Sequence, residues 1–470
     1  MSTAAILGGG VIGGGWAARF LLMGWDVVVY DPASDAKAKL DEVMNNAKRS
    51  LPALSEHALP AMGTLTWADD IAAAVKEASW IQESVPERLN IKHDVLKLVQ
   101  THCRKDAIIG SSTSGFKPSQ LQAYSDNPDQ IIVAHPFNPV YLLPLAELVG
   151  NADTVKRAQI VLQGIGMHGM HVRKEIDAHI ADRFLEAVWR EGLWLIKDGI
   201  ATTQEIDDAI RFGFGLRWAQ MGLFETYRIA GGEAGMAHFI EQFGPALEWP
   251  WTKLMDVPEL TEELINKIAA QSDEQSGMHT IRELERIRDD NLVGMMRALK
   301  ARGWGAGKLL NDHDRKTLPD ISSKSGELIN SINRAIPIDW TDYNGHMNES
   351  RYGQVFSDAA DSVLRMMGVD EAYIDGGSSY FTVDIHIKFM EETLAHENIK
   401  VYSQVLLGEG KKLRLFHQMM SDDDRLLATG EQMLLHVDLK TRKSSVPEGE
   451  VLNQLNILAQ LHADLPHPGA

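Results

Sequence analysis

Apolar and polar positions divide the chain into three regions with different periods. Up to about residue 174, short apolar runs alternate with helical stretches, which is typical of a parallel sheet covered by helices on both faces. From about 175 to 318 a helical period dominates, as in 179–199, where Gly199 provides a helix end. Beyond about residue 332, one helix predicted over 349–367 precedes strands of alternating pattern. The chain therefore combines an α/β, an all-helical and an α+β unit.

These patterns also give element and domain boundaries. In the first region we predict strands at 4–7, 27–30, 80–83, 107–110, 131–134, 145–149 and 169–172. In the last region we predict them at 380–390, 398–410, 412–421 and 427–439. A polar, serine-rich stretch separates the helical unit from the last one and is interpreted as a linker. The predicted divisions are 1–176, 177–320, the linker 321–332, 333–455 and a tail over 456–470.

A glycine motif of spacing G-x-G-x-x-G follows the first predicted strand and opens a helix predicted over 11–23. In such a motif the glycines permit a tight turn, the approach of a pyrophosphate and close helix packing, and the helix N-terminus holds the phosphates. Asp31 ends the second strand, where a carboxylate accepts hydrogen bonds from ribose hydroxyls and repels a 2′-phosphate. We therefore predict a Rossmann domain that binds NAD, through Gly8, Gly10, Val11, Ile12, Gly13 and Asp31.

Three polar residues of the same region suggest acid–base chemistry. His135 ends one predicted strand, and Glu147 lies on the next. Glu147 could hold one imidazole nitrogen while the other exchanges a proton with a substrate hydroxyl, and Ser114 could bind the same oxygen. A lone histidine is more often a core residue or a cap, but the acid on the neighbouring strand and the nicotinamide site favour a catalytic role.

Composition and charge exclude several classes of partner. The formal net charge of −19 argues against nucleic acid or an anionic membrane as a partner. No apolar run reaches membrane-spanning length, and the N-terminus lacks the pattern of a signal peptide. The single cysteine, Cys103, fits a reducing compartment, so we expect a cytoplasmic protein. We predict no metal site.

The segments GGGVIG, SSTSG, HPFNPV and LAELVG resemble the 3-hydroxyacyl-CoA dehydrogenase superfamily over about residues 1–318. This resemblance implies an all-helical dehydrogenase C-terminal domain after the Rossmann domain, and it places Ser114, His135 and Glu147 on the catalytic positions of the family. Less directly, it implies that Glu87 and Lys92 contact the cofactor.

One position departs from the family pattern. At the start of the helical unit the family has an asparagine, whereas this chain has Asp182 within IADRF. An acid there would carry charge beside the His135–Glu147 pair. It could adjust the histidine, or it could face a positively charged substrate.

The helical unit is dense in aromatic residues, and its sequence resembles the L-carnitine dehydrogenase branch of the superfamily. Quaternary ammonium groups bind on aromatic faces with help from carboxylates, and L-carnitine is a 3-hydroxy acid with a trimethylammonium group. Most of these aromatic residues are expected to form a helical core and a dimer surface. The candidates are Trp218, Phe224, Tyr227, Phe239, Phe243, Trp249 and Trp251, with Glu225 and Glu233 between them.

The last region resembles the hotdog-fold thioesterases through the motif D-x-x-G-H-x-N, formed by Asp342, Gly345, His346 and Asn348 before the long helix. Asn348 is a good helix N-cap, and backbone amides near Gly345 could polarise a thioester carbonyl. Asp342 could attack that carbonyl or activate a water molecule. The structural alternative is a turn in which Asp342 only accepts backbone hydrogen bonds.

Together the resemblances imply two activities: NAD-dependent oxidation of the 3-hydroxyl of L-carnitine, and hydrolysis of a CoA thioester, betainyl-CoA. They also imply a homodimer, because hotdog domains generally pair their sheets. Three alternatives remain open. The first is a 3-hydroxyacyl-CoA dehydrogenase with its own thioesterase, the second a non-catalytic NAD-binding protein, and the third a dehydrogenase whose last domain only dimerises or senses a ligand.

Overall fold

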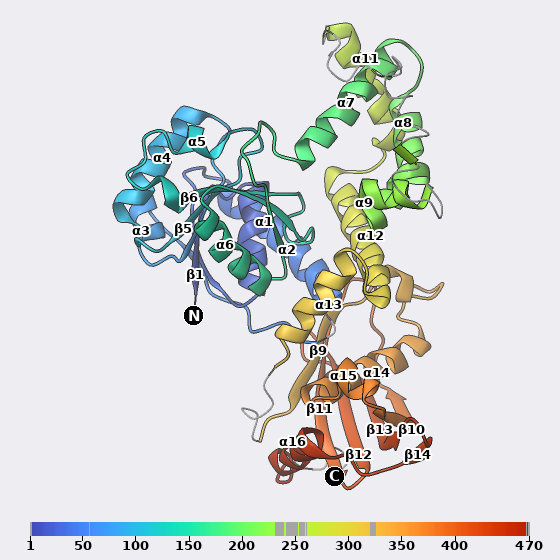
Figure 1. Ribbon diagram of the computed structural model, residues 1–470. Helices are drawn as coiled ribbons and strands as arrows, with labels where there is room; N and C mark the ends of the chain where they lie inside the picture. The colour runs from blue at the N-terminus through green and yellow to red at the C-terminus, as the bar shows by residue number, and fades with distance from the viewer. Residues whose placement is uncertain are drawn as a thin grey trace.

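Figure 1 shows the computed structural model, in which three parts follow one another along the chain. The structure describes residues 2–55, 57–230, 239–240, 252, 259, 261–319, 326–466 and 468. The N-terminal part ends with the strand at 168–171, the helical part extends from 181 to 316, and the C-terminal part begins at 326. No described helix is both long and apolar enough to cross a bilayer.

The N-terminal part is built on one sheet of eight strands in the order β3-β2-β1-β4-β5-β6-β7-β8. The strands are β1 (Thr3–Leu7), β2 (Asp26–Tyr30), β3 (Leu65–Trp67), β4 (Trp80–Glu83), β5 (Ile108–Ser111), β6 (Ile131–Pro136), β7 (Leu145–Val149) and β8 (His168–His171). The first six in this order form a parallel doubly wound sheet. The predicted doubly wound parallel sheet is confirmed with one exception, because β7 pairs antiparallel with β6 and parallel with β8.

Helices cover both faces of this sheet, so every residue of β4, β5 and β6 is buried. In β1, Ala4 and Ile6 belong to one apolar core, whereas Ala5 and Leu7 belong to the other. Strand β3 was not predicted, since three residues are too few for a periodic signal. The helices are α1 (Val11–Leu22), α2 (Ala36–Ser50), η1 (Leu51–Leu54), α3 (Ile71–Val75), α4 (Leu89–His102), α5 (Pro118–Leu121), η2 (Pro128–Gln130) and α6 (Ala152–Gly164).

The helical part contains no strand among its described residues, as the periodicity predicts. Three of its described helices start at side-chain caps, for example the one that begins at Thr280, whose hydroxyl and Glu283 form a capping box. After α7 the chain turns at Gly199, whose φ of +71° is the expected left-handed helix end. The elements are α7 (Ala181–Lys197), α8 (Thr203–Ala209), η3 (Ile210–Phe214), α9 (Gly215–Ala230), α11 (Glu262–Ser276), α12 (Ile281–Arg302) and α13 (Ala306–Lys316).

The C-terminal part wraps an antiparallel sheet of order β10-β13-β12-β11-β9 around one long helix, α14 (Figure 1). This helix begins at Asn348, whose side chain caps it, and its apolar face belongs to both cores of this part. This is the predicted α+β hotdog arrangement. The elements are β9 (Ile329–Ala335), η7 (Ile338–Trp340), α14 (Glu349–Met366), α15 (Glu371–Asp375), β10 (Ser378–Phe389), β11 (Asn398–Glu409), β12 (Lys412–Ser421), β13 (Leu426–Asp438), β14 (Lys443–Ser444) and α16 (Gly449–Leu461).

Strand β9 begins inside the stretch that we predicted as a linker, 321–332. Its residues pair with β11, and Ile329 and Ile332 are buried. The strand escaped prediction because serine and asparagine residues interrupt its apolar pattern, although Ser331 is buried and bonded to Ser403. At the other end, α16 continues past the predicted domain end at residue 455.

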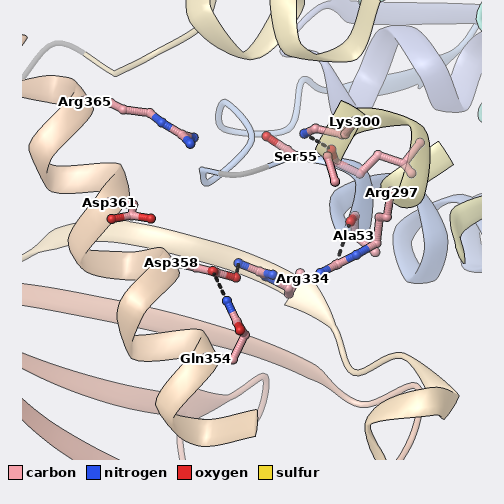
Figure 2. Close-up of a pocket in the computed structure, with 11 residues that line it drawn as sticks. Ala53, Ser55, Arg297, Lys300, Arg334, Gln354, Asp358, Asp361 and Arg365 are labelled. Carbon is pink, nitrogen blue, oxygen red and sulfur yellow. Dashed lines mark hydrogen bonds and ion pairs between the residues drawn. The ribbon is translucent and has the colours of Figure 1, made fainter. Parts of the chain in front are cut away.

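The C-terminal part packs directly against the rest of the chain, along a contact surface that we call the junction. Here β9 and α14 face η1 and α12, and Figure 2 shows basic side chains from both sides pointing into a pocket of about 220 Å³. Arg49 of α2 forms an ion pair with Asp290 and lies 3.3 Å from Nδ1 of His396. A further ion pair joins Arg315 to Glu371 at 2.9 Å. The junction is therefore rich in charges.

Candidate active sites

The glycine motif forms the turn between β1 and α1, and two of its glycines are required by close contacts. Gly8 has a φ of +97°, and a Cβ atom there would lie 2.5 Å from the carbonyl oxygen of Ser84. A Cβ atom on Gly13 would lie 1.8 Å from the oxygen of Gly8. Both positions exclude any other residue, as the sequence predicts.

The start of α1 is open toward the side where a dinucleotide would lie. Nothing approaches the Cβ position of Gly10 within 4 Å, and Gly10 offers no side chain to cap the helix amides. Val11 is 52% exposed there, whereas Ile12 packs against the core. Asp31 accepts hydrogen bonds from the amide of Gly9 at 2.6 Å and from that of Ala33 at 2.8 Å. The residues present therefore fit a dinucleotide, with Asp31 fixed at the edge of the turn.

Glu87 and Lys92 lie together but differ in exposure. The Lys92 amine is buried and lies 2.8 Å from an oxygen of Glu83 and 3.1 Å from one of Glu87. Glu87 is 47% exposed and accepts a hydrogen bond from the hydroxyl of Thr113. Lys92 thus stands behind Glu87, and only Glu87 of the two reaches the open side. The sequence did not reveal Glu83, whose partner comes from the next helix.

Ser114, His135 and Glu147 come together as predicted. Nδ1 of His135 lies 3.0 Å from Oε2 of Glu147, and Nε2 lies 3.2 Å from Oγ of Ser114. The antiparallel pairing of β6 and β7 sets His135 directly opposite Glu147, so the contact follows from register rather than from two adjacent strand ends. Ser114 lies three residues beyond the end of β5, in the following loop.

Glu147 is fixed from a second side by the start of α7. Its Oε1 accepts hydrogen bonds from the amides of Ile180 at 2.9 Å and Ala181 at 3.1 Å. Burial alone would raise the pKa of Glu147, but the hydrogen bonds from His135 and from these amides outweigh it, so the pKa lies below its ordinary value. Glu147 therefore remains a carboxylate around neutral pH and orients the imidazole.

Two further residues surround His135. An Asp182 oxygen lies 3.5 Å from Nε2 of His135. The pKa of Asp182 lies above its ordinary value, chiefly because the side chain is partly buried. The nearby His135 lowers this pKa, whereas the negative charge of Glu147 raises it further. The His179 ring lies 5.4 Å from that of His135, and burial lowers the pKa of His179, so this ring is neutral. His179 was not predicted, because its position depends on a turn with φ of +51°.

The aromatic segment is described only in part. Tyr227 stacks on Phe239 at 4.7 Å, Trp218 lies 4.7 Å from Phe214, and Phe224 is 69% exposed. Four of the candidates, Phe243, Trp249, Trp251 and Glu233, lie outside the described residues, as does the side chain of Glu225.

Asp342 lies in a tight turn before α14. Its Oδ1 accepts hydrogen bonds from the amides of Asn344 at 2.8 Å and His346 at 3.3 Å. The Gly345 amide donates to the Asp342 carbonyl at 3.0 Å, so it is engaged inside the turn rather than presented to a substrate. Nε2 of His346 lies 3.5 Å from Glu392. The turn that we considered as the structural alternative is therefore present, with the half-buried Asp342 carboxylate at its centre.

Matches to family models follow the three parts of the fold. Residues 3–176 match the NAD binding domain of 3-hydroxyacyl-CoA dehydrogenase, and residues 179–270 match the C-terminal domain of that family. Residues 336–455 match the thioesterase-like superfamily. The first part of the chain is thus an NAD-binding domain. Among the described residues, no group of three or more histidine, cysteine or acidic side chains is arranged to hold a metal ion.

Some similar proteins match only the dehydrogenase parts of the chain, whereas others match its whole length. A solved structure of FHMPC 5-dehydrogenase, described as an NAD+ dependent dismutase, has a TM-score of 0.55 and 28% identity, over 64% of this chain and 99% of that one. The L-carnitine dehydrogenase of Mesorhizobium japonicum is 55% identical over 69% of this chain and 91% of its own. The L-carnitine dehydrogenase/betainyl-CoA thioesterase of Ruegeria pomeroyi is 60% identical over 100% of this chain and 98% of its own. The chain belongs to the L-carnitine dehydrogenase/betainyl-CoA thioesterase family.

Proposed function

We propose that this protein oxidises the 3-hydroxyl group of L-carnitine with NAD, giving 3-dehydrocarnitine, and that its C-terminal part hydrolyses betainyl-CoA. The arrangement of Ser114, His135 and Glu147 carries the first activity, because it provides a base, its orienting acid and a hydroxyl donor at one point. The names of the full-length relatives support both substrates.

In the oxidation, Nε2 of His135 accepts the proton of the substrate hydroxyl, and Ser114 holds the same oxygen. Glu147 keeps Nδ1 protonated and stabilises the imidazolium that forms. NAD, when bound, accepts the hydride from the carbinol carbon. The open N-terminus of α1 would hold its pyrophosphate, and Asp31 would hold its ribose.

In the hydrolysis, Asp342 is the candidate for the group that attacks the thioester carbonyl or activates the attacking water. Its carboxylate is positioned by the amides of Asn344 and His346. The amide of Gly345 is engaged inside the turn, so it is not available to polarise the carbonyl oxygen of the thioester.

The test of the function is a substrate screen on the full chain. NAD reduction is measured with L-carnitine, 3-hydroxybutyrate, 3-hydroxyacyl-CoA and gulonate, and CoA release is measured with betainyl-CoA and acetyl-CoA. We expect carnitine and betainyl-CoA to be the preferred substrates. Preference for 3-hydroxyacyl-CoA would instead favour a 3-hydroxyacyl-CoA dehydrogenase with its own thioesterase.

Replacing Asp31 with alanine is expected to weaken NAD binding, because the ribose hydroxyls lose their hydrogen-bond acceptor. The same change should narrow the preference for NAD over NADP, because no carboxylate then repels the 2′-phosphate of NADP. The expected rise of Kd for NAD is about tenfold or more, since hydrogen bonds to charged groups contribute about 1.5–3 kcal/mol. Asp26→Ala, at the opposite end of β2, is the control. Equal use of both cofactors by the unmodified protein would contradict the role of Asp31.

We also infer a homodimer, which an exposed strand edge supports. β10 is the edge of its sheet, and Phe381, Val383 and Ile385 on it are 40%, 55% and 41% exposed. A long strand edge with exposed apolar side chains is a template for pairing with another chain. Light scattering is expected to give twice the chain mass, and a monomer at micromolar concentration would contradict the inference.

We also infer a cytoplasmic location, which the single cysteine supports and which cell fractionation would check.

A further inference from the structure

The Asp182 carboxylate borders the place where the substrate hydroxyl must arrive. One of its oxygens lies 3.5 Å from Nε2 of His135, the nitrogen that also faces Ser114. Asp182 belongs to the first turn of α7, where the helix amides favour a negative charge, and its side chain is 19% exposed. A substrate bound to His135 is therefore in contact with this acid or separated from it by one group.

The covalent structure of the proposed substrate brings its cation to the same place. In L-carnitine the quaternary nitrogen is three bonds from the hydroxyl oxygen. When the hydroxyl binds at Nε2 of His135, the trimethylammonium group therefore lies beside that imidazole. A quaternary ammonium cannot donate a hydrogen bond, so it is recognised by nearby negative charge and by aromatic faces.

Asp182 adds a second negative charge at the place where two positive charges come together during the oxidation. Accepting the hydroxyl proton makes the imidazole positive, next to the fixed positive charge of the substrate. Glu147, already bound to Nδ1, compensates the imidazolium. A second carboxylate beside Nε2 compensates the substrate cation, while the neutral His179 adds no positive charge. The remaining acid near Asp182, Glu186, lies one turn along α7 and adds to the same negative field.

We propose that Asp182 determines specificity by holding the quaternary ammonium group of the substrate beside His135. This assignment rests on the proposed oxidation of L-carnitine. The assignment also explains why Asp182 stands where the family has an asparagine. An uncharged asparagine can accompany an uncharged 3-hydroxyacyl group, whereas a quaternary ammonium group beside His135 requires a negative charge.

The experiment compares L-carnitine with its carbon isostere, 3-hydroxy-5,5-dimethylhexanoate, in which a carbon atom replaces the quaternary nitrogen. We expect the unmodified protein to prefer carnitine about a hundredfold in kcat/KM, and Asp182→Asn to reduce that ratio about ten- to a hundredfold. The inhibition constant of 4-trimethylammoniobutanoate, which keeps the cation but lacks the hydroxyl, is expected to rise by a similar factor. Asp177→Asn removes the same charge from the preceding loop, where Asp177 pairs with Lys117, and is expected to keep the ratio.

The outcomes separate this assignment from the proposed function. If the unmodified protein oxidises carnitine but prefers it less than about threefold over the isostere, the assignment is overturned without any variant. If the Asp182→Asn variant binds NAD normally and oxidises carnitine and the isostere more slowly by the same factor, Asp182 acts through His135. The assignment is then again overturned. If the unmodified protein does not oxidise carnitine at all, the proposed function is refuted together with the assignment.

Discussion

Replacing His135 with alanine is expected to lower NAD-dependent carnitine oxidation about a hundred- to ten-thousand-fold, while NAD binding stays close to normal. The imidazole is the base of the site, and its Nε2 faces Ser114 while Glu147 holds Nδ1. The variant removes no contact of the glycine turn, so the affinity for NAD measured by calorimetry should be retained. Turnover is measured by NADH absorbance.

The pH dependence gives a second readout of the same prediction. Only a neutral imidazole can accept the proton and only an imidazolium can return it, so the oxidation rate of the unmodified protein should rise with pH and the reduction rate should fall. Glu147 does not contribute to this slope, because its lowered pKa keeps it charged throughout. The residual activity of His135→Ala should lack the slope. His168→Ala, an exposed histidine on β8, is the control. Normal turnover of folded His135→Ala would remove His135 from the mechanism.

Replacing Asp342 is expected to lower betainyl-CoA hydrolysis about a hundredfold or more, while carnitine oxidation stays largely intact. Two variants are needed, because Asp342 also accepts two amide hydrogen bonds in its turn. Asp342→Asn keeps an acceptor oxygen for the turn and removes the carboxylate. Asp342→Ala removes both. We expect both variants to lose hydrolysis, measured as CoA release with a thiol reagent.

The asparagine variant decides between the two interpretations of Asp342. If Asp342→Asn retains hydrolysis and only Asp342→Ala loses it, the residue shapes the turn and another group performs the chemistry. If either variant, when folded, abolishes carnitine oxidation, the separation into two sites is wrong. Asp339→Ala, an exposed acid three residues earlier, controls for a change of charge in this region.

The sequence predicted those elements that have a clear period and a defined end. β1 and β2, and the four long strands of the last sheet, were placed within a few residues, because alternation or a fully apolar run marks them. The contact of His135 with Glu147 was predicted from two neighbouring strands. Its geometry was not, since nothing in the 131–149 pattern shows that β7 reverses direction. That reversal puts the pair in direct register.

Other features depend on contacts between segments that are distant in the sequence. Whether Glu83 or Glu87 would hold Lys92 depends on how α4 lies against β4, which no local pattern records. The proximity of Asp182 to His135 depends on the turn before α7. Buried polar residues likewise concealed β9, because Ser331 satisfies its hydroxyl only through another strand.

The charged junction has a consequence for how such two-activity chains arise and separate. The exposed pair of Arg315 with Glu371 would return to water at little cost, since exposed ion pairs contribute at most about 1 kcal/mol. The contact of Arg297 with the ring of Trp340 differs, because that ring is buried. A split of the gene between the two parts would therefore expose an aromatic ring as well as charges, because Trp340 is buried at this junction. A protein named for the dehydrogenase alone, that of Mesorhizobium japonicum, matches only 69% of this chain, so a lineage that lacks the companion part must have a different surface where Trp340 packs here.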